Sequence, residues 1–162
     1  MSIDVTQLRD VIVKPTLIAL GLWSPGATQL LLGTAAQETQ LGKYLIQQKI
    51  GFRGGIGIFQ MQSPAFMSTW DKMVTPNLVM RNRLKLLLGY ESRPVADRMA
   101  SDLLLATAMC RLYYAAITTA LPQADDVTGM ANYYKTYYNT AIGKSTTQEF
   151  VRNYEIYVLG KD

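Results

Sequence analysis

The sequence predicts a single domain that is mostly α-helical. Its 162 residues, 49% of them hydrophobic, suffice for one core of domain size and are too few for two. Hydrophobic residues recur at helical spacing along most of the chain, and only a short piece around 56–61 has strand character. A proline follows a serine or threonine at three places, which is typical of the first turn of a helix. These places are Ser24-Pro25, Ser63-Pro64 and Thr75-Pro76.

The helix boundaries follow from these starts and from residues that end helices. We expect helices over 5–21, 25–41, 64–73, 76–88, 94–120, 127–138 and 147–159. The expected stops are Gly42, Gly89, Leu121-Pro122 and Gly160. Thr146 and Glu149 have the spacing of a capping box ahead of the last helix. The longest helix, 94–120, is apolar on most sides in its middle, so we expect the others to pack around it.

Composition limits the function classes. The net charge of +4 is spread along the chain without a run longer than two like charges, so nucleic acid is not an expected partner. The chain has no histidine and one cysteine, Cys110, which argues against a metal site, and we expect no cofactor. Cys110 lies in an apolar run, where it is expected to be a small buried hydrophobe rather than a nucleophile.

The start of the chain predicts neither a secretory signal nor a membrane span. An acidic residue, Asp4, stands among the first residues, and Lys14-Pro15 interrupts the apolar stretch that follows. We therefore expect synthesis in a cytoplasm, with some other agent carrying the protein to any work outside it.

Glu38 is a single carboxylate in an otherwise apolar helical stretch, "GTAAQETQLGKYL". Around it, at helical spacing, lie Leu30, Leu31, Thr34 and Leu41. A solvated glutamate at a helix end, beside Gln37 and Gln40, would explain this pattern. So would an acid in an apolar site, where desolvation raises the pKa and the carboxyl keeps its proton near neutral pH.

One stretch, "KIGFRGGIGIFQMQSPAF", lacks helical character. Four glycines occur within seven residues of it, at Gly51, Gly54, Gly55 and Gly57. The apolar residues between and after them must pack on something, and the end of the helix bearing Glu38 is the nearest candidate. We expect a glycine-rich loop or a minimal β-hairpin here. A phosphate loop does not fit, because no Gly-Lys-Ser/Thr follows.

Three segments in order resemble the lysozyme-like lytic transglycosylases and goose-type lysozymes. They are "AAQETQLG", "GIGIFQMQSPAF" and "MANYYKTYYNTAIGKSTTQEF". In that family a helix-borne Glu followed by Ser or Thr precedes a Gly-x-x-Gln-Met/Leu segment and a late Tyr-Asn motif. The form of the third segment is similar to lysozyme-like proteins of tailed bacteriophages. The resemblance runs from about residue 30 to residue 155 and implies a lysozyme-like fold for the single domain, 1–162.

The resemblance also implies a site. Glu38 would be the catalytic acid, and the expected substrate-binding residues are Thr39, Gly57, Phe59, Gln60, Met61, Tyr134, Tyr138 and Asn139. In the family a tyrosine at the place of Tyr138 hydrogen-bonds the acid. Gln60 is expected either to cap the helix at Pro64 or to contact sugar or hold the loop. The family often has Ala-Gly after Tyr-Asn, whereas here Thr140 begins a longer connection to Gly143, which leaves the geometry of that loop and any role of Thr140 open.

The tyrosine-rich segment "NYYKTYYN" suits a glycan, because aromatic faces stack on sugar rings. With Lys135 the same rings could stack on single-stranded nucleic acid. We expect Tyr134 and Tyr138 on one face of the helix and Tyr133 and Tyr137 on another, with one pair lining the site.

The number of acids bears on the reaction. No Asp or Glu occurs from residue 39 to residue 70, so a second carboxylate is missing from its expected place near Glu38. The resemblance then implies a lytic transglycosylase, in which one glutamate acts twice on the bond between N-acetylmuramic acid and N-acetylglucosamine. If Asp71, Asp97 or Asp102 folds near Glu38, hydrolysis by a muramidase is expected instead.

A different class of function also fits. The chain could be a non-catalytic virion or wall-binding protein that keeps the lysozyme-like fold. For both classes the resemblance implies a phage virion as the location and peptidoglycan glycan strands as the partner, with other virion proteins as further candidates.

Overall fold

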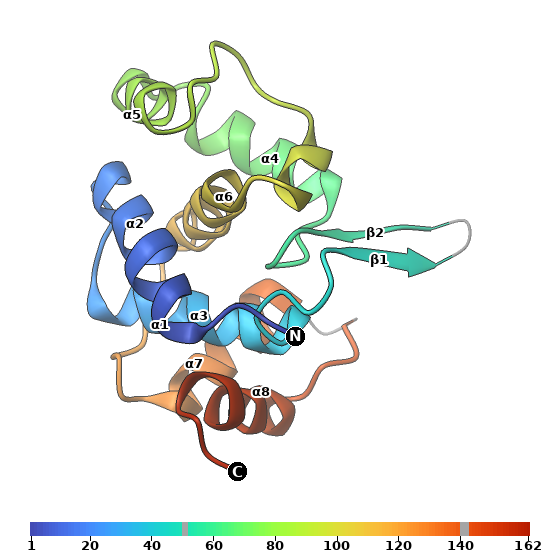
Figure 1. Ribbon diagram of the computed structural model, residues 1–162. Coiled ribbons are helices and arrows are strands. Elements are labelled where there is room, and N and C mark those ends of the chain that lie inside the picture. The colour runs from blue at the N-terminus through green and yellow to red at the C-terminus, as the bar shows by residue number, and fades with distance from the viewer. Residues whose placement is uncertain (50–51, 140–142) are drawn as a thin grey trace.

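Helices make up most of the computed structural model, which describes residues 1–49, 52–139 and 143–162. The elements in chain order are α1 (Val5–Gln7), η1 (Leu8–Val13), α2 (Lys14–Leu20), α3 (Pro25–Thr39), β1 (Ile46–Lys49), β2 (Phe52–Ile56), α4 (Ser63–Met73), α5 (Leu78–Leu88), η2 (Ala96–Ala100), α6 (Leu103–Ala115), α7 (Val127–Tyr133), η3 (Tyr134–Asn139), α8 (Thr147–Asn153) and η4 (Tyr154–Val158). They form one compact, mostly α domain, which confirms the predicted fold class. The α6 helix runs through the middle of the molecule, with α4 and α5 on one side of it and α7 and α8 on the other (Figure 1).

The first helical stretches follow local signals. The α1, η1 and α2 segments run on from one another between residues 5 and 20, and Gly21 ends them with a φ of 70°. Ser24 caps α3, because its hydroxyl accepts a hydrogen bond from the amide of Ala27 at 3.0 Å, and Pro25 takes the first helical position. The capping box predicted at Thr146 and Glu149 is present at the start of α8.

Most predicted helices agree with the structure to within two residues at each end, and two differ in ways that have a clear cause. The helix expected over 76–88 begins at Leu78, because Asn77 rather than Thr75 caps it, with its side chain accepting from the amide of Met80. The prediction of one long helix over 94–120 was wrong. The chain there forms the 3-10 helix η2 and the separate helix α6, which ends at Ala115.

Asp102 separates η2 from α6 because its side chain caps the start of α6. This carboxylate accepts the amide of Leu105 at 3.0 Å and the hydroxyl of Tyr90 at 3.0 Å, so it starts a new helix instead of continuing the previous one. The α6 helix is still the buried centre of the domain, with Leu105, Met109 and Cys110 fully inaccessible to solvent. Burial raises the pKa of the Cys110 thiol, as expected of a small core residue.

The glycine-rich stretch forms a minimal β-hairpin. β1 and β2 pair antiparallel with Ile46 opposite Ile56, and the tip, which includes Gly51, lies outside the described residues. The strand character predicted around 56–61 was misplaced, because residues 57–60 form a turn that ends in an isolated bridge between Ile56 and Met61. None of the helices in the described ranges is long and apolar enough to cross a bilayer.

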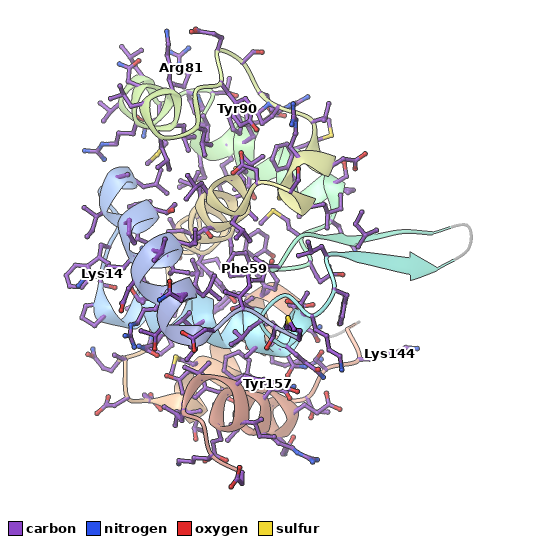
Figure 2. The ribbon with its side chains drawn as sticks, in the orientation of Figure 1. Lys14, Phe59, Arg81, Tyr90, Lys144 and Tyr157 are labelled. Carbon is purple, nitrogen blue, oxygen red and sulfur yellow. The ribbon has the colours of Figure 1, made fainter. Side chains whose placement is uncertain are left out.

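Gly57 sets the position of this turn. Its φ is 78°, and a Cβ atom on it would lie 2.4 Å from the carbonyl oxygen of Met99. Only glycine satisfies both conditions without strain. The next residues then turn inward, so that Phe59 is buried in the middle of the molecule (Figure 2). The turn is thereby fixed against the core beside the end of α3.

Candidate active site

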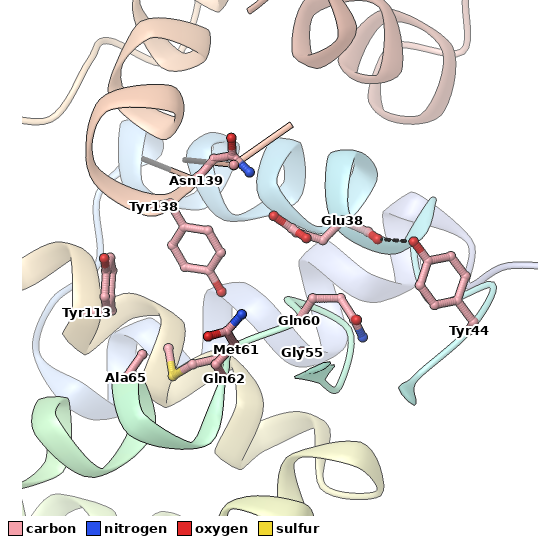
Figure 3. Close-up of a pocket in the computed structure, with 11 residues that line it drawn as sticks. Glu38, Tyr44, Gly55, Gln60, Met61, Gln62, Ala65, Tyr113, Tyr138 and Asn139 are labelled. Carbon is pink, nitrogen blue, oxygen red and sulfur yellow. Dashed lines mark hydrogen bonds between the residues drawn. The ribbon is translucent and has the colours of Figure 1, made fainter. Parts of the chain in front are cut away.

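A groove of about 500 Å³ crosses the domain where the end of α3 and η3 face the base of the hairpin and the start of α4. It is lined by Glu38, Tyr44, Gly55, Gln60, Met61, Gln62, Ala65, Tyr113, Tyr138, Asn139 and Gly143. In Figure 3, Glu38 and Asn139 lie on one side of the groove and Gln60, Met61 and Gln62 on the other. The lining therefore combines aromatic, amide and backbone surface with one ionisable carboxyl group.

Glu38 reaches the groove because α3 stops immediately after it. Gln40, Leu41 and Gly42 all have positive φ, at 51°, 59° and 83°, and they turn the chain away from the helix axis. The hydroxyl of Tyr44 then donates to the backbone carbonyl of Glu38 at 2.5 Å and satisfies one of the free acceptors at the helix end. Left-handed conformations at two non-glycine residues are uncommon and often occur beside functional sites.

Thr39 joins this helix end to the hairpin. Its hydroxyl donates to the carbonyl of Ile58 at 2.8 Å, with the carbonyl of Ala35 as a longer, shared acceptor at 3.2 Å, and it accepts the amide of Gly42. It is fully buried, so it holds the turn after β2 against the end of α3 and does not line the groove. The structure thus places Thr39 behind the groove and not, as expected, on its surface.

The carboxyl of Glu38 is held in a desolvated setting. Burial raises its pKa to about 7, and the hydrogen bond from the hydroxyl of Tyr134 to Oε1, 2.5 Å long, acts in the opposite direction. No charged side chain contributes to the shift. Glu38 is half-buried and not a fully solvated glutamate at the helix end, and its carboxyl keeps its proton to higher pH than an exposed glutamate does.

The tyrosine that bonds the acid is Tyr134 and not Tyr138, which corrects the prediction from the Tyr-Asn motif. Tyr138 donates instead to the carbonyl of Phe59 at 2.6 Å. The two rings stack with centroids 5.8 Å apart, because residues four apart on a helix share a face. The sequence cannot tell which of them reaches α3, since that depends on how η3 lies across it.

The two faces expected of the tyrosine-rich helix are present. Tyr133 and Tyr137 pack on each other with centroids 4.7 Å apart, and their hydroxyls both bond Thr119. Tyr134 is fully buried behind Glu38, so Tyr138 alone of these four tyrosines lines the groove, rather than a pair.

Gln60 is a loop-holding amide. Its Nε2 donates to the carbonyl of Gly57 at 2.9 Å and to that of Leu45 at 3.4 Å. The cap of α4 is Gln62, so the alternative in which Gln60 caps that helix is wrong. Gly55 lies so close that a Cβ atom there would meet the backbone oxygen of Gln60 at 2.4 Å. The hairpin base and the turn thus form one rigid wall of the groove.

Of the predicted substrate-binding residues, four line the groove, namely Gln60, Met61, Tyr138 and Asn139. Gly57 and Phe59 lie buried behind its wall, as do Thr39 and Tyr134, so the structure does not bring these four to the groove surface. Their roles in the structure are to shape the turn and to hold Glu38.

Other residues that line the groove were not predicted from the sequence. Tyr113 lies in the apolar run that forms α6, where nothing distinguishes it from a core residue. Tyr44 follows Gly42 just after the helix of Glu38, and its closeness in sequence to the acid was a usable signal. Gln62 and Ala65 line the groove from the start of α4.

Lys135 fixes the far wall of the groove. Its ammonium group donates to Oδ1 of Asn139 at 2.8 Å and to the carbonyl of Gly143 at 2.7 Å. Because the Asn139 oxygen is engaged, its amide NH₂ group is the part available to a ligand in the groove. Thr140, Ala141 and Ile142 lie outside the described residues, so the role of Thr140 stays open.

No second carboxylate accompanies Glu38 among the described residues that line the groove. Asp71 pairs with Arg93 at 3.2 Å, Asp102 caps α6, and Asp97 is exposed on η2. Every Asp and Glu of the chain lies within the described ranges. The arrangement can therefore donate and accept one proton at one carboxyl group, against a wall of amide and aromatic groups.

Comparison with known proteins gives no relative: no family model, no curated protein and no solved structure matches this chain.

Proposed function

We propose that the protein is a lytic transglycosylase that cleaves the bond between N-acetylmuramic acid and N-acetylglucosamine in peptidoglycan. The observation that carries the proposal is Glu38, the one carboxylate among the described groove residues, with a pKa raised to about 7. A general acid is most useful when its pKa lies near the working pH, and burial supplies that here.

In the proposed mechanism Glu38 acts twice. It first gives its proton to the glycosidic oxygen, and the bond from the muramic acid C1 to that oxygen breaks. The resulting carboxylate then takes the proton of the C6 hydroxyl as O6 bonds to C1, which closes a 1,6-anhydro ring and returns the proton to Glu38. Water is not consumed. The nucleophile is already tethered to the sugar, so the step gains from proximity and requires no second acid.

The surrounding residues have supporting roles in this proposal. Tyr134 orients Glu38 through the bond to Oε1 and leaves Oε2 for the substrate. The amide NH₂ of Asn139, held by Lys135, is suited to donate to a carbonyl or hydroxyl oxygen of the sugar. Tyr44, Tyr113 and Tyr138 offer aromatic surface for sugar rings. A long polysaccharide fits an open groove better than a closed cavity.

Clearing of purified murein, followed as the loss of turbidity, tests the proposal. The wild-type protein is expected to clear the suspension, and Glu38→Gln to abolish clearing, because an amide cannot donate the required proton. The matched control is Glu155→Gln, which removes a carboxylate that is paired with Lys161 outside the groove and should clear at the wild-type rate. Retained clearing by Glu38→Gln would end the assignment of the acid, and no clearing by any form, with intact binding to murein, would favour a wall-binding protein.

The resemblance to tailed-phage proteins supports a further part of the proposal, that the enzyme is carried in a virion and opens the wall locally during genome entry. Detection of the chain in purified phage particles by mass spectrometry tests it, and its presence only in lysates without particles would contradict it.

A further inference from the structure

The outer face of α5 carries apolar side chains that no part of the described chain covers. Leu86 is 89% exposed, Leu78 61% and Val79 57%. Residues seven and eight apart on a helix lie on one face, so the three side chains point outward together as an aliphatic stripe, with the exposed Asn82 between Leu78 and Leu86. The opposite face packs on the domain through Met80 and Leu84, which are buried. The α5 helix therefore has a buried apolar inner face and, in addition, three exposed aliphatic side chains on its outer face.

Cations gather on the same part of the chain. Residues 70–93 contain five of the sixteen Lys and Arg and two of the twelve Asp and Glu, so they carry a net +3 of the chain's +4. Within α5 there is no acidic residue. Arg81 and Lys85, four residues apart, border the stripe on one side. Arg83 lies on the other and is held by a bond to the carbonyl of Leu20 at 2.8 Å.

A hollow of about 360 Å³ opens beside this stripe, between α4, α5 and the connection that follows α5. Trp70, Leu78 and Tyr90 are part of its lining, together with the cations Arg81, Lys85 and Arg93. Figure 2 shows Arg81 and Tyr90 at this end of the molecule. Glu91 is the one carboxylate among the described lining residues, and it pairs with Lys85 at 3.0 Å. Arg93 likewise pairs with Asp71 at 3.2 Å, so Arg81 is the cation of the described lining that is in no ion pair. The hollow thus offers apolar and aromatic surface beside Arg81 and two paired cations.

We propose that α5 and this hollow form a binding surface for an anionic phospholipid bilayer, with the helix lying in the plane of the interface. An outward aliphatic stripe flanked by Arg and Lys is the pattern of helices that lie on membranes. Phosphate headgroups match the cations in charge, and the stripe supplies apolar area to bury. This inference does not depend on the proposed function, because none of these residues lines the groove of Glu38.

Single-stranded nucleic acid is the other polyanion that such a surface suggests. It binds by stacking bases on exposed aromatic faces. Here Trp70 and Tyr90 are only partly exposed, while the most exposed apolar side chains are aliphatic, which favours lipid. The choice between these two polyanions is one of the outcomes of the test.

Co-sedimentation with vesicles tests the inference. The full chain is expected to bind vesicles of equal parts phosphatidylcholine and phosphatidylglycerol, to bind pure phosphatidylcholine much less, and to be released as salt is raised. Leu86→Ser should weaken binding about tenfold, since it removes an inserted apolar side chain. Arg81→Glu should weaken it by about fivefold or more, since it removes one cation and adds an opposing charge.

Matched control variants separate this surface from general effects. Leu159→Ser changes an exposed leucine near the opposite end of the molecule, and Arg152→Glu changes an exposed arginine on α8. Both should bind vesicles as the wild type does. Because all four positions are exposed, the thermal midpoints should stay close to the wild-type value, which excludes unfolding as the cause of lost binding.

Fluorescence gives an independent readout, because the chain has two tryptophans, Trp23 and Trp70. In a Trp23→Phe protein the emission reports Trp70 alone and should shift to shorter wavelength on addition of the anionic vesicles. The inference is overturned if the protein ignores the vesicles, if neutral vesicles bind equally well, or if the α5 variants behave as their controls. Displacement of bound vesicles by a single-stranded oligonucleotide at low concentration would overturn it in favour of nucleic acid.

Discussion

Two opposing effects set the pKa of Glu38, namely its burial at an apolar helix end and the hydrogen bond that it accepts from one donor. Burial raises its pKa from 4.5 to about 7, and the Tyr134 hydroxyl opposes that rise without cancelling it. The folded protein therefore holds this proton over a pH range where the unfolded chain has lost it. The contribution of this group to the free energy of unfolding is fully present below pH 4.5 and is lost as the pH rises through about 7.

The Glu38→Gln variant should reveal this linkage. At 1.36 kcal/mol per pKa unit, the ionised Glu38 costs the folded state up to about 3 kcal/mol at alkaline pH, and the neutral amide avoids that cost. The variant should be more stable than the wild type by about 1–3 kcal/mol above pH 8 and nearly equal to it in acid. Thermal midpoints of both proteins across this pH range give the comparison. An equal difference at acid and alkaline pH would mean that Glu38 ionises normally.

Tyr134→Phe should move the pH profile of the proposed activity. Its hydroxyl lowers the pKa of Glu38, so removing it raises that pKa further, and the acid stays protonated to higher pH. The alkaline limb of the kcat/KM profile should therefore move to higher pH. The maximal rate should fall, because the carboxyl loses the hydrogen bond that orients it. Tyr138→Phe is the matched control, since Tyr138 bonds the carbonyl of Phe59, and its alkaline limb should stay in place.

At the scale of elements, the site depends on the junction between the end of α3 and the turn after β2. Thr39 bonds the carbonyl of Ile58 across this junction, and Gly57 allows the turn to approach η2. A helix alone would present Glu38 without a facing wall. The hairpin base and the turn after it supply that wall.

Gly57→Ala tests the junction, with Gly89→Ala as its control. Both glycines have positive φ, at 78° and 74°, so both substitutions carry a similar backbone cost. At Gly57 the new Cβ would also lie 2.4 Å from the Met99 carbonyl oxygen, whereas at Gly89 nothing lies within 4 Å. Urea unfolding should show Gly57→Ala to be the less stable variant by about 1–3 kcal/mol. Equal losses would mean that the turn relaxes freely.

Much of this element structure could be predicted from the sequence, because helix starts and stops are local signals. Ser24 and Thr146 cap the helices they were expected to cap. Asp102 was missed as a cap because an isolated aspartate within an apolar run also fits the polar side of a continuous helix. Strand β1 was missed because "IQQK" has no period of its own, and pairing with β2 depends on contacts between distant residues.

The candidate site was predictable only in part for the same reason. The sequence pointed to Glu38, Gln60, Met61, Tyr138 and Asn139, which all line the groove. Which of Tyr134 and Tyr138 reaches the acid depends on the relative placement of η3 and α3, and no local pattern encodes it. Tyr113 lines the groove from a helix that is otherwise core.

At the scale of the molecule, α4 borders two separate sites. Ala65, near its start, lines the groove of Glu38, and Trp70, nearer its end, lines the hollow beside α5. The two proposed activities should therefore separate. Arg81→Glu should lower vesicle binding and leave the clearing of purified murein unchanged, and Glu38→Gln should do the reverse. Loss of both activities in either variant would show that the sites are coupled.

The products of murein digestion test the central claim most directly. A hydrolase needs a second group to activate water or attack the sugar, and no other carboxylate among the described residues lines the groove. Mass spectrometry of the released muropeptides should therefore show 1,6-anhydromuramic acid ends, each lighter by one water than the hydrolysed form. Reducing muramic acid ends as the dominant product would contradict the single-acid account and identify the enzyme as a muramidase.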